Sequence, residues 1–394
     1  MKILYICNRF YPALGGVETH VFNIAKKFVN NKNSVDVVCS DMITASSSER
    51  FKNKSGEIEK INFRRLRSFK ILGLDPATII PYLPIFLVLN VRQYDVIHAH
   101  SYGYFTSWAS ILTCRLMNKK IIYTPHYADE TMLPKMVKKI FDFLVAGWSF
   151  RMATRVVALT SVEKDILIRK FKVKPENIVV IPNGINLNEY SEKILSDKEK
   201  EEVLSKNGIT NKNKNIITVS RIAKNKGHIY LLKAFKEISN CNLIIIGKDW
   251  GEKEYLTNYI RKEKISNVFF LENIDDVEKN NLLKSSNVFV LPSLGGEAFG
   301  IVLLEAMANG LPTIASNVGG IKDLICESKN GYLVEPGNEQ QIREKVNTIL
   351  FSKDIKSMQR YCRDFVSRYD WEKVYEKITN LYHDVLFKKI ENQV

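Results

Sequence analysis

Short runs of β-branched and aliphatic residues recur along this 394-residue chain, and helix-like stretches separate most of them. This alternation is typical of α/β domains, in which helices cover a mainly parallel sheet. We therefore predict a doubly wound parallel sheet in each half. The strands expected in the first half cover 3–7, 35–38, 95–98, 120–123, 155–158 and 178–181. Those expected in the second half cover 216–219, 243–246, 268–271, 288–291 and 313–315.

The boundary between the halves is expected near 182–186, where Pro-Asn-Gly-Ile-Asn is a strong turn signal. The charged stretch 191–205 after it is expected to be a surface helix. Another helix is expected from Trp371 onward, because apolar residues recur there at helical spacing through Val385. This last helix follows the second α/β pattern and therefore needs another surface to cover.

Composition excludes several other classes of protein. The apolar, uncharged run 76–91 is shorter than the roughly 18 residues of a spanning helix and contains three prolines. The first residues, MKILYICNRF, do not resemble a secretory signal, so we expect a cytoplasmic protein. The six cysteines form no C-x-x-C pair, and Cys7 and Cys39 are expected to be buried thiols.

The positive charge lies almost entirely in the first half. Residues 1–187 contain 27 Lys and Arg against 14 Asp and Glu, a net +13 of the chain's +15. Such a domain attracts nucleic acid, an anionic membrane surface or an acidic small molecule. Charge alone does not choose among these three partners.

Four motifs follow expected strands, where open parallel sheets bind their ligands. Gly15 and Gly16 precede a helix, where free backbone N–H groups suit an anion, although the pair also fits a plain turn. Arg221 and Lys226 share one loop and form a cationic pair suited to a diphosphate. The alternative for this loop is a solvated basic surface. Because both residues lie on a loop, truncating either is expected to leave the fold intact.

The segment 292–307 contains two glutamates eight residues apart in an apolar context. Glu297 is expected at a helix start, where the helix dipole favours a carboxylate. Glu305 is expected about two turns later, inside an apolar helix where a bare charge is costly. Sugar or ribose hydroxyls would satisfy these carboxylates. A capping Glu297 and a Glu305 paired with a nearby cation are the structural alternative.

His100 and His126 each follow an expected strand of the first half, which favours a site there. The remaining histidines are His20, His98, His228 and His383, and for these we expect structural roles.

The motifs Gly15-Gly16-Val17-Glu18, Thr124-Pro125-His126, Pro182-Asn183-Gly184, Arg221…Lys226-Gly227 and Glu297-x7-Glu305 occur in a diagnostic order. In this order they resemble retaining glycosyltransferases of family four, which have the GT-B fold, and the resemblance spans nearly the whole chain. It implies two Rossmann-like domains facing across a cleft, an acceptor-side domain over 1–185 and a nucleotide-sugar-binding domain over 186–370. It also implies a C-terminal helix over 371–394 that crosses back to the first domain.

The resemblance assigns roles to individual residues. Gly16, beside Gly15, would donate its backbone N–H to the donor phosphate. Arg221 and Lys226 would hold the diphosphate and stabilise the leaving group. Glu305 would accept hydrogen bonds from the ribose.

The resemblance also assigns the sugar and acceptor contacts. Glu297, with the backbone of Phe299 and Gly300, would position the transferred sugar, and His126 would face its anomeric carbon. His100 and Tyr102 would lie on the acceptor side. Departures from the family pattern are Tyr127, Asn186 and Ser220, where Asp, Asp and Gly are frequent.

The resemblance favours a hexosyltransferase that uses a nucleotide sugar and needs no cofactor. Alternatives are a GT-B nucleotide-sugar epimerase or phosphorylase, and, in another class, a basic nucleic-acid-binding protein. The last leaves the post-strand motifs unexplained, and we expect no nucleic-acid partner. The chain contains no Asp-x-Asp triplet, so we expect activity without a metal ion.

Two segments of the basic half, 61–70 and 136–151, mix cations with apolar residues. Such surfaces suit anionic lipid, and we expect a peripheral enzyme on the inner face of the membrane with a lipid-linked or anionic glycan acceptor. The alternative is that Phe141, Leu144 and Trp148 face the core, with Lys138 and Lys139 merely solvated.

Overall fold

The structure, a computed structural model, describes residues 1–13, 15–44, 49–70, 78–128, 135–190, 195–210 and 213–387. Contacts divide the chain into two units. Unit 1 comprises Met1–Tyr127, Thr131–Gly184 and Trp371–Val394, and unit 2 comprises Ala128–Glu130 and Ile185–Asp370.

An eight-stranded sheet forms the centre of unit 1, in the order β10-β9-β8-β7-β1-β2-β4-β3. Its strands are β1 (Lys2–Ile6), β2 (Ser34–Ser40), β3 (Ser55–Ile58), β4 (Ile61–Leu66), β7 (Val96–His100), β8 (Ile122–Thr124), β9 (Arg155–Ala158) and β10 (Ile178–Val180). All neighbours pair in parallel except β3, which runs antiparallel to β4 at the sheet edge. Two short strands, β5 (Phe69–Lys70) and β6 (Thr78–Ile79), form a separate antiparallel pair.

Helices cover both faces of this sheet because alternate side chains of its strands enter different cores. Leu4 and Ile6 of β1 join one core, whereas Ile3 and Tyr5 join the other. The helices of unit 1 are α1 (Gly16–Asn30), α2 (Tyr82–Asn90), α3 (Phe105–Leu116), α4 (Lys135–Phe141), α5 (Gly147–Met152), α6 (Ser161–Arg169) and α14 (Trp371–Phe387). Shorter turns are η1 (Val91–Gln93), the π-helical η2 (Asp142–Ala146) and η3 (Pro175–Asn177).

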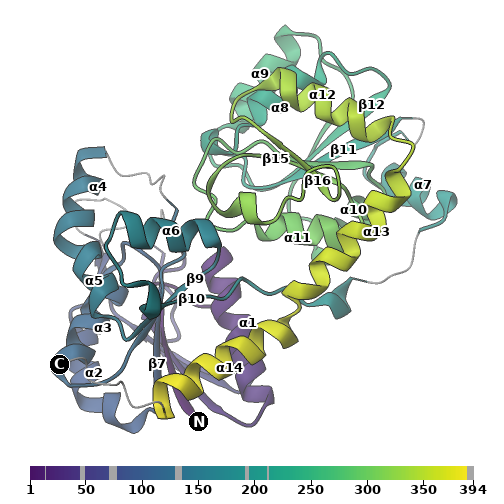
Figure 1. Cartoon of the computed structure of the whole chain (residues 1–394). Helices are drawn as coiled ribbons and strands as arrows, with labels where there is room; N and C mark the ends of the chain where they lie inside the picture. Colours follow the sequence, from purple (N-terminus) through teal and green to yellow (C-terminus); the bar gives the residue numbers. More distant parts are fainter. Residues whose placement is uncertain are drawn as a thin grey trace. The chain divides into compact units, whose positions relative to one another are not determined.

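The C-terminal helix α14 belongs to unit 1 and lies beside α1 (Figure 1). Its apolar stripe, which includes Val374, Ile378 and Leu381, shares a core with β1 and α1. The hydroxyls of Tyr5 and Tyr382 lie 3.0 Å apart within this core. The surface that the sequence left unidentified for this helix is therefore one face of the first sheet. Residues 388–394 of the expected helix lie outside the described part of the chain.

Unit 2 contains a six-stranded sheet in the order β13-β12-β11-β14-β15-β16, parallel throughout. Its strands are β11 (Lys214–Val219), β12 (Cys241–Ile246), β13 (Val268–Leu271), β14 (Val288–Leu291), β15 (Thr313–Ser316) and β16 (Gly331–Val334). Its helices are α7 (Asp197–Lys206), α8 (His228–Phe235), α9 (Lys253–Lys262), α10 (Asp276–Lys284), α11 (Ile301–Ala308), α12 (Glu339–Leu350) and α13 (Ile355–Val366). Short 3-10 turns are η4 (Leu187–Glu189), η5 (Lys224–Lys226), η6 (Gly319–Asp323) and η7 (Ser367–Tyr369).

The expected fold class is confirmed, with α/β architecture and a mainly parallel sheet in each unit. Every strand expected from an apolar run is present, but β3, β4, β5, β6 and β16 were not anticipated. The expected helix at 191–205 corresponds to α7, which begins after a capping box at Ser196. Residues 191–194 lie outside the described ranges. Cys7 and Cys39 are buried free thiols, as expected.

Candidate active site

The cationic loop and the first glutamate meet at one edge of the sheet of unit 2. Lys226 follows β11 and Glu297 follows β14, and these two strands are neighbours. Their side chains form an ion pair between Lys226 Nζ and Glu297 Oε1, and Ser293 Oγ donates to the same oxygen at 2.7 Å. Both side chains of the pair are nearly buried, with exposed fractions of 10% and 12%. Two motifs 71 residues apart thus form one polar cluster.

A glycine allows this close approach. Gly227 has a φ of 68°, in the left-handed region that disfavours residues with a Cβ. A Cβ there would lie 2.1 Å from the carbonyl oxygen of Pro292, at the start of the Glu297 loop. The amide of Leu294 also donates to the Asn225 carbonyl at 2.8 Å. The Lys226-Gly227 sequence therefore reflects tight packing between the two loops.

The structure corrects two expectations for this cluster. Glu297 does not begin a helix, because α11 starts at Ile301 after Gly300, and Glu297 lies in the preceding loop. Nor is Lys226 a solvated loop residue whose truncation would leave the fold intact, because its side chain is buried against a carboxylate. Phe299 is also buried, with its ring centroid 6.0 Å from that of Tyr369.

Arg221 occupies a different environment on the same loop. Its side chain is exposed, and its guanidinium lies over the Trp250 ring, 4.5 Å from the ring centroid. This cation–π contact holds the guanidinium without neutralising it. The loop therefore carries two exposed cations, Arg221 and Lys224, and one buried, paired cation, Lys226.

Glu305 lies in α11 and takes a lysine from α10 as its partner. Its Oε2 atom lies 3.0 Å from Lys279 Nζ, which also bonds Asp276 at 2.8 Å. Burial raises the pKa of Glu305, and the Lys279 charge opposes this shift. Both glutamates are thus paired with lysines, and for Glu305 this pairing is the structural alternative. Lys279 has no signal in the sequence, because it lies 26 residues from its partner on another helix.

The glycine motif of unit 1 follows β1 and opens α1, as expected. Glu18 lies in the first turn of α1 and accepts a hydrogen bond from Arg9 Nε at 2.8 Å. A Cβ on Gly15 would lie 2.2 Å from a Glu18 carboxylate oxygen, so a larger residue there would displace this carboxylate. A Cβ on Gly16 would meet no other atom within 4 Å. Leu14 lies outside the described residues.

Three histidines of unit 1 converge, and one of them was not expected. His100 ends β7 and His126 follows the adjacent strand β8, and His100 Nδ1 lies 3.3 Å from His126 Nε2. His20 of α1 completes the cluster, with its ring centroid 5.1 Å from that of His126. Because His20 lies three residues after Val17 and four before Ile24, the helical stripe already placed it on the inward face. This spacing was the signal for His20 in the sequence.

Burial keeps this cluster uncharged. It lowers the pKa of His20 to about 4 and the pKa values of His100 and His126 well below the ordinary value. His98 is structural, as expected, because its two ring nitrogens bond Tyr382 at 2.8 Å and Thr124 at 2.7 Å. Tyr102 is not part of the cluster; its hydroxyl donates to Asp142.

Glu163 of α6 holds the backbone that carries His126. Its carboxylate accepts from the amide of Tyr127 at 2.8 Å and from that of Leu159 at 2.6 Å. His126 has a φ of 51°, a left-handed conformation that needs such support. Burial raises the pKa of Glu163 to about 7 despite both hydrogen bonds. We infer that Glu163 is a positioning residue for His126.

This pKa shift makes the stability of unit 1 depend on pH. The unfolded chain loses the Glu163 proton near its ordinary pKa of 4.5, whereas the folded chain keeps it to about pH 7. Stability from this group is therefore lost as pH rises through that window. Glu163→Gln removes the titration, so the stability advantage of wild type over the variant should shrink by about 2 kcal/mol between pH 5 and pH 8.5. Urea unfolding, followed by hydrogen exchange of unit 1 peptides, measures the free energy of unfolding of both proteins at each pH. If the stability difference between wild type and variant stays constant from pH 5 to pH 8.5, Glu163 is ionised in the folded chain throughout this range.

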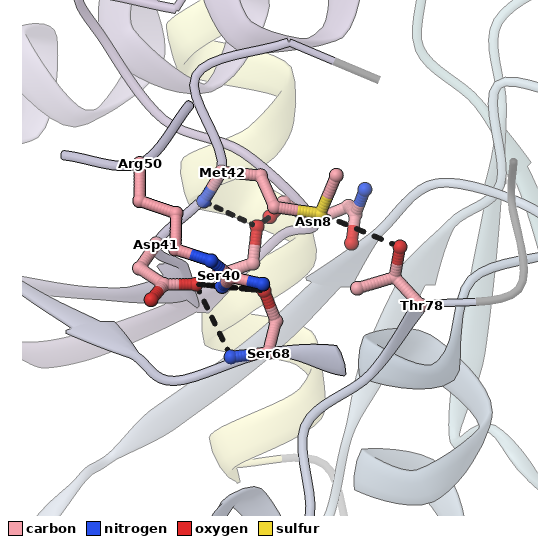
Figure 2. A network of polar contacts seen from close by, with 7 residues as sticks. All are labelled: Asn8, Ser40, Asp41, Met42, Arg50, Ser68 and Thr78. Carbon is pink, nitrogen blue, oxygen red and sulfur yellow. Dashed lines mark hydrogen bonds and ion pairs between the residues drawn. The ribbon is translucent and has the colours of Figure 1, made fainter. Parts of the chain in front are cut away.

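A second polar group lies at the carboxyl ends of β1, β2 and β4 (Figure 2). Asp41 Oδ1 accepts from Arg50 at 2.5 Å and from the Ser68 hydroxyl at 2.7 Å, and Ser40 Oγ donates to the carbonyl of Asn8. The Asn8 side chain is 2% exposed, yet neither its oxygen nor its nitrogen has a hydrogen-bond partner among the described residues. Since buried amides are normally paired, Asn8 offers unused capacity for a ligand. No sequence motif pointed to it.

The basic segment 61–70 is mainly a strand rather than a membrane-facing surface. Arg65 of β4 is 4% exposed, packs its guanidinium over Phe51 and Phe63, and donates to the carbonyl of Tyr11 at 2.8 Å. Only Arg64 and Arg67 of the three arginines are exposed. Expecting all three to face lipid was therefore wrong for Arg65.

The second segment is divided between core and surface. Phe141 and Trp148 pack against the core, as in the alternative interpretation, but Leu144 is 58% exposed. Lys138 is paired with Asp142 rather than solvated. No helix in the described ranges is long and apolar enough to cross a membrane.

Most of the chain matches two models of known protein families. Residues 14–189 match the model "Glycosyltransferase Family 4", and residues 199–364 match the model "Glycosyl transferases group 1". A galactosyltransferase of Escherichia coli, named for UDP-Gal and α-D-GlcNAc-diphosphoundecaprenol, is 29% identical over 317 residues, covering 78% of this chain and 80% of the relative. A phosphatidyl-myo-inositol mannosyltransferase of Mycobacterium leprae is 25% identical, covering 98% of this chain and 97% of the relative.

A solved structure has the same fold. Anabaena HepE in complex with UDP and glucose superposes with a TM-score of 0.75 at 20% identity, covering 97% of this chain and 99% of that one. The two α/β units have the GT-B fold of glycosyltransferases. More narrowly, the chain belongs to glycosyltransferase family four, as the resemblance implied.

Proposed function

We propose that this enzyme moves a sugar from a nucleotide-diphosphate sugar to a lipid-linked or anionic glycan acceptor, with retention at the anomeric carbon and without a metal ion. The observation that carries the donor assignment is the loop after β11, which presents exposed Arg221 close in sequence to Lys226. Two cations at the carboxyl edge of a parallel sheet suit the leaving diphosphate, where charge develops as the sugar departs.

The lysine–glutamate pairs suggest how the donor would enter. A diphosphate would compete with Glu297 for Lys226 and thereby free the carboxylate to accept from a sugar hydroxyl. Glu305, near Lys279, would accept from the ribose. In each case the ligand would replace one partner of a lysine–glutamate ion pair within unit 2. Because these charges are already desolvated in the pair, the cost of removing them from water on binding is limited.

The acceptor is proposed to bind at unit 1, with His126 facing the reacting carbon and His100 and Tyr102 on the acceptor side. Asn8 is a further candidate because its buried amide lacks a partner in the described structure. The names of the Escherichia coli and Mycobacterium leprae relatives specify diphosphoundecaprenol-linked and phosphatidylinositol acceptors, which supports a lipid-linked class here.

A panel of labelled nucleotide sugars tests this function. The chain is incubated with each donor and with polyprenol-diphosphate-linked, phosphatidylinositol and soluble glycan acceptors, and products are separated and their anomeric configuration read by NMR. We expect transfer to one acceptor class with the donor's configuration kept. Epimerised nucleotide sugar would support an epimerase, and phosphate-dependent cleavage a phosphorylase. Affinity for nucleic acid without any turnover would support the binding protein instead.

Metal independence is a separate prediction. Because Arg221 and Lys226 can supply positive charge beside the diphosphate, chelation should leave transfer within about twofold of the untreated rate. Initial rates are measured with EDTA and after adding magnesium or manganese. Loss of activity on chelation, restored by either ion, would contradict the proposal.

A hydrophobic surface supports the peripheral membrane location. It comprises the exposed residues of α4 and η2, which we call the α4 patch: Met136, Val137, Lys139, Ile140, Phe143 and Leu144. The apolar members are 46% to 82% exposed. An apolar helical surface with an adjacent cation suits the interface of anionic lipid, since unpartnered patches of this kind mark interaction sites.

We expect binding to vesicles that contain phosphatidylglycerol and not to neutral ones, with weakening as salt rises. Replacing Phe143 and Leu144 by serine should reduce vesicle binding about tenfold, because binding then no longer transfers two large apolar side chains from water into lipid. Replacing Arg64 and Arg67, but not buried Arg65, should weaken the preference for anionic lipid. Phe351→Ser, at an 81% exposed position of unit 2, is the matched control. Equal binding by all variants would favour a soluble acceptor.

A further inference from the structure

The three-histidine cluster of unit 1 has the composition and spacing of a metal site. Each of His20, His100 and His126 offers a ring nitrogen, and these three atoms all lie within 4.8 Å of one another. Two nitrogens bound to one zinc ion at about 2.0 to 2.1 Å in tetrahedral geometry are about 3.3 Å apart. His100 Nδ1 and His126 Nε2 already lie at 3.3 Å. A modest inward movement of the third ring would complete the set.

The fold holds these ligands firmly. His100 and His126 come from the ends of adjacent parallel strands, and His20 comes from a helix packed on the same sheet. His20 and His100 are 3% and 0% exposed. The rings also contact one another in tilted and edge-to-face arrangements, with centroids 5.1 to 5.6 Å apart. All three ligands lie in one unit, so the site needs nothing from the other.

The cluster also has unused donor and acceptor capacity. Within the described residues, His20 Nδ1 and His100 Nε2 have no hydrogen-bond partner although both are buried. The neutral imidazole is the form that binds metals. One ring nitrogen of the His100–His126 hydrogen bond carries a proton. A change of tautomer would move this proton to the other nitrogen of the same ring. Both His100 Nδ1 and His126 Nε2 would then be free to bind a metal ion. No net proton need be lost.

We propose that His20, His100 and His126 bind one zinc ion, with the fourth coordination position open. Zinc in proteins is usually four-coordinate and tetrahedral, and three imidazoles supply three of the four ligands. We further infer that bound zinc inhibits sugar transfer by occupying His126. This second part rests on the proposed function of His126; the binding site itself does not.

Binding is tested on the full chain, purified without a polyhistidine tag and freed of metal. Zinc is titrated in competition with a chromophoric chelator, and cobalt(II) is added separately as a spectroscopic probe. We expect one equivalent of tight zinc and a cobalt spectrum with the intense visible bands of tetrahedral coordination. His20→Gln should weaken zinc binding by about 100-fold or more, because a ligand is lost. His383→Gln, at an exposed histidine outside the cluster, should bind as wild type does.

Circular dichroism shows whether His20→Gln folds, and His100→Gln serves as a second variant if it does not. Zinc should also raise the melting temperature of wild type and not that of the folded variant. Absence of stoichiometric zinc, or unchanged affinity in both variants, would overturn the site and leave a hydrogen-bonded histidine cluster.

Inhibition is tested separately once a donor is known. Zinc should lower the transfer rate of wild type, a chelator should restore it, and His20→Gln should keep its rate in the presence of zinc. If zinc binds tightly but transfer continues unchanged, the metal site stands and the inhibition and the role of His126 are wrong. If zinc does not bind, the transferase proposal is unaffected.

Discussion

Arg221→Ala is expected to lower kcat/KM for the donor by about 100- to 1000-fold, which is the usual effect of removing one group that stabilises developing charge. Arg221 is exposed and held over Trp250, so its loss removes a cation without opening the core. Initial rates over a range of donor concentrations measure the effect. A fall in kcat as well as a rise in KM would indicate that Arg221 acts on the leaving group.

Lys224→Ala is the matched control, because Lys224 lies in the same loop and its side chain is also exposed. It should change kcat/KM by less than about threefold, as expected for a screened surface charge. Similar losses in both variants would mean that the loop acts through its overall charge. Near-wild-type transfer by Arg221→Ala would refute the diphosphate assignment.

Lys226→Met is expected to destabilise unit 2 by about 3 kcal/mol, because it leaves the Glu297 carboxylate nearly buried without its cation. Urea unfolding followed by hydrogen exchange of unit 2 peptides measures this loss. The double variant Lys226→Met, Glu297→Gln should recover at least half of it, since both charges are then removed together. Donor turnover should stay low in the single and the double variant.

Lys224→Met controls for the substitution itself and should be stable within about 0.5 kcal/mol of wild type. Additive effects in the double variant would show that Lys226 and Glu297 do not interact. Full stability of Lys226→Met would mean that the ion pair contributes nothing in solution, and that Lys226 is free to meet a diphosphate.

The sequence predicted those strands whose apolar residues form continuous runs, because buried parallel strands need them on both faces. It missed β4, where arginines interrupt the run. In that strand Arg65 is itself an inward residue, and two phenylalanine rings cover its guanidinium. A charge buried in this way looks like a surface charge in the sequence.

The candidate site was predictable where the chemistry lies in one loop or after one strand. The loop of Arg221 and the strand-end histidines were identified in this way. Lys279 and Asn8 were not, because Lys279 pairs with a residue of another helix and Asn8 is distinguished only by its lack of a partner among the described residues. His20 is an intermediate case, since its position in a helical stripe was visible but its neighbours were not.

The placement of α14 in unit 1 has a consequence for synthesis on the ribosome. The first strand and α1 emerge early, but the helix that covers their apolar face is made only after unit 2, and the partner of Tyr5 lies 377 residues further along the chain. Unit 1 therefore cannot complete its core until every residue of unit 2 has been added. A nascent chain with this open face is exposed to aggregation for most of its synthesis. A premature stop just before Trp371 would spare all of unit 2 and still leave the first sheet uncovered.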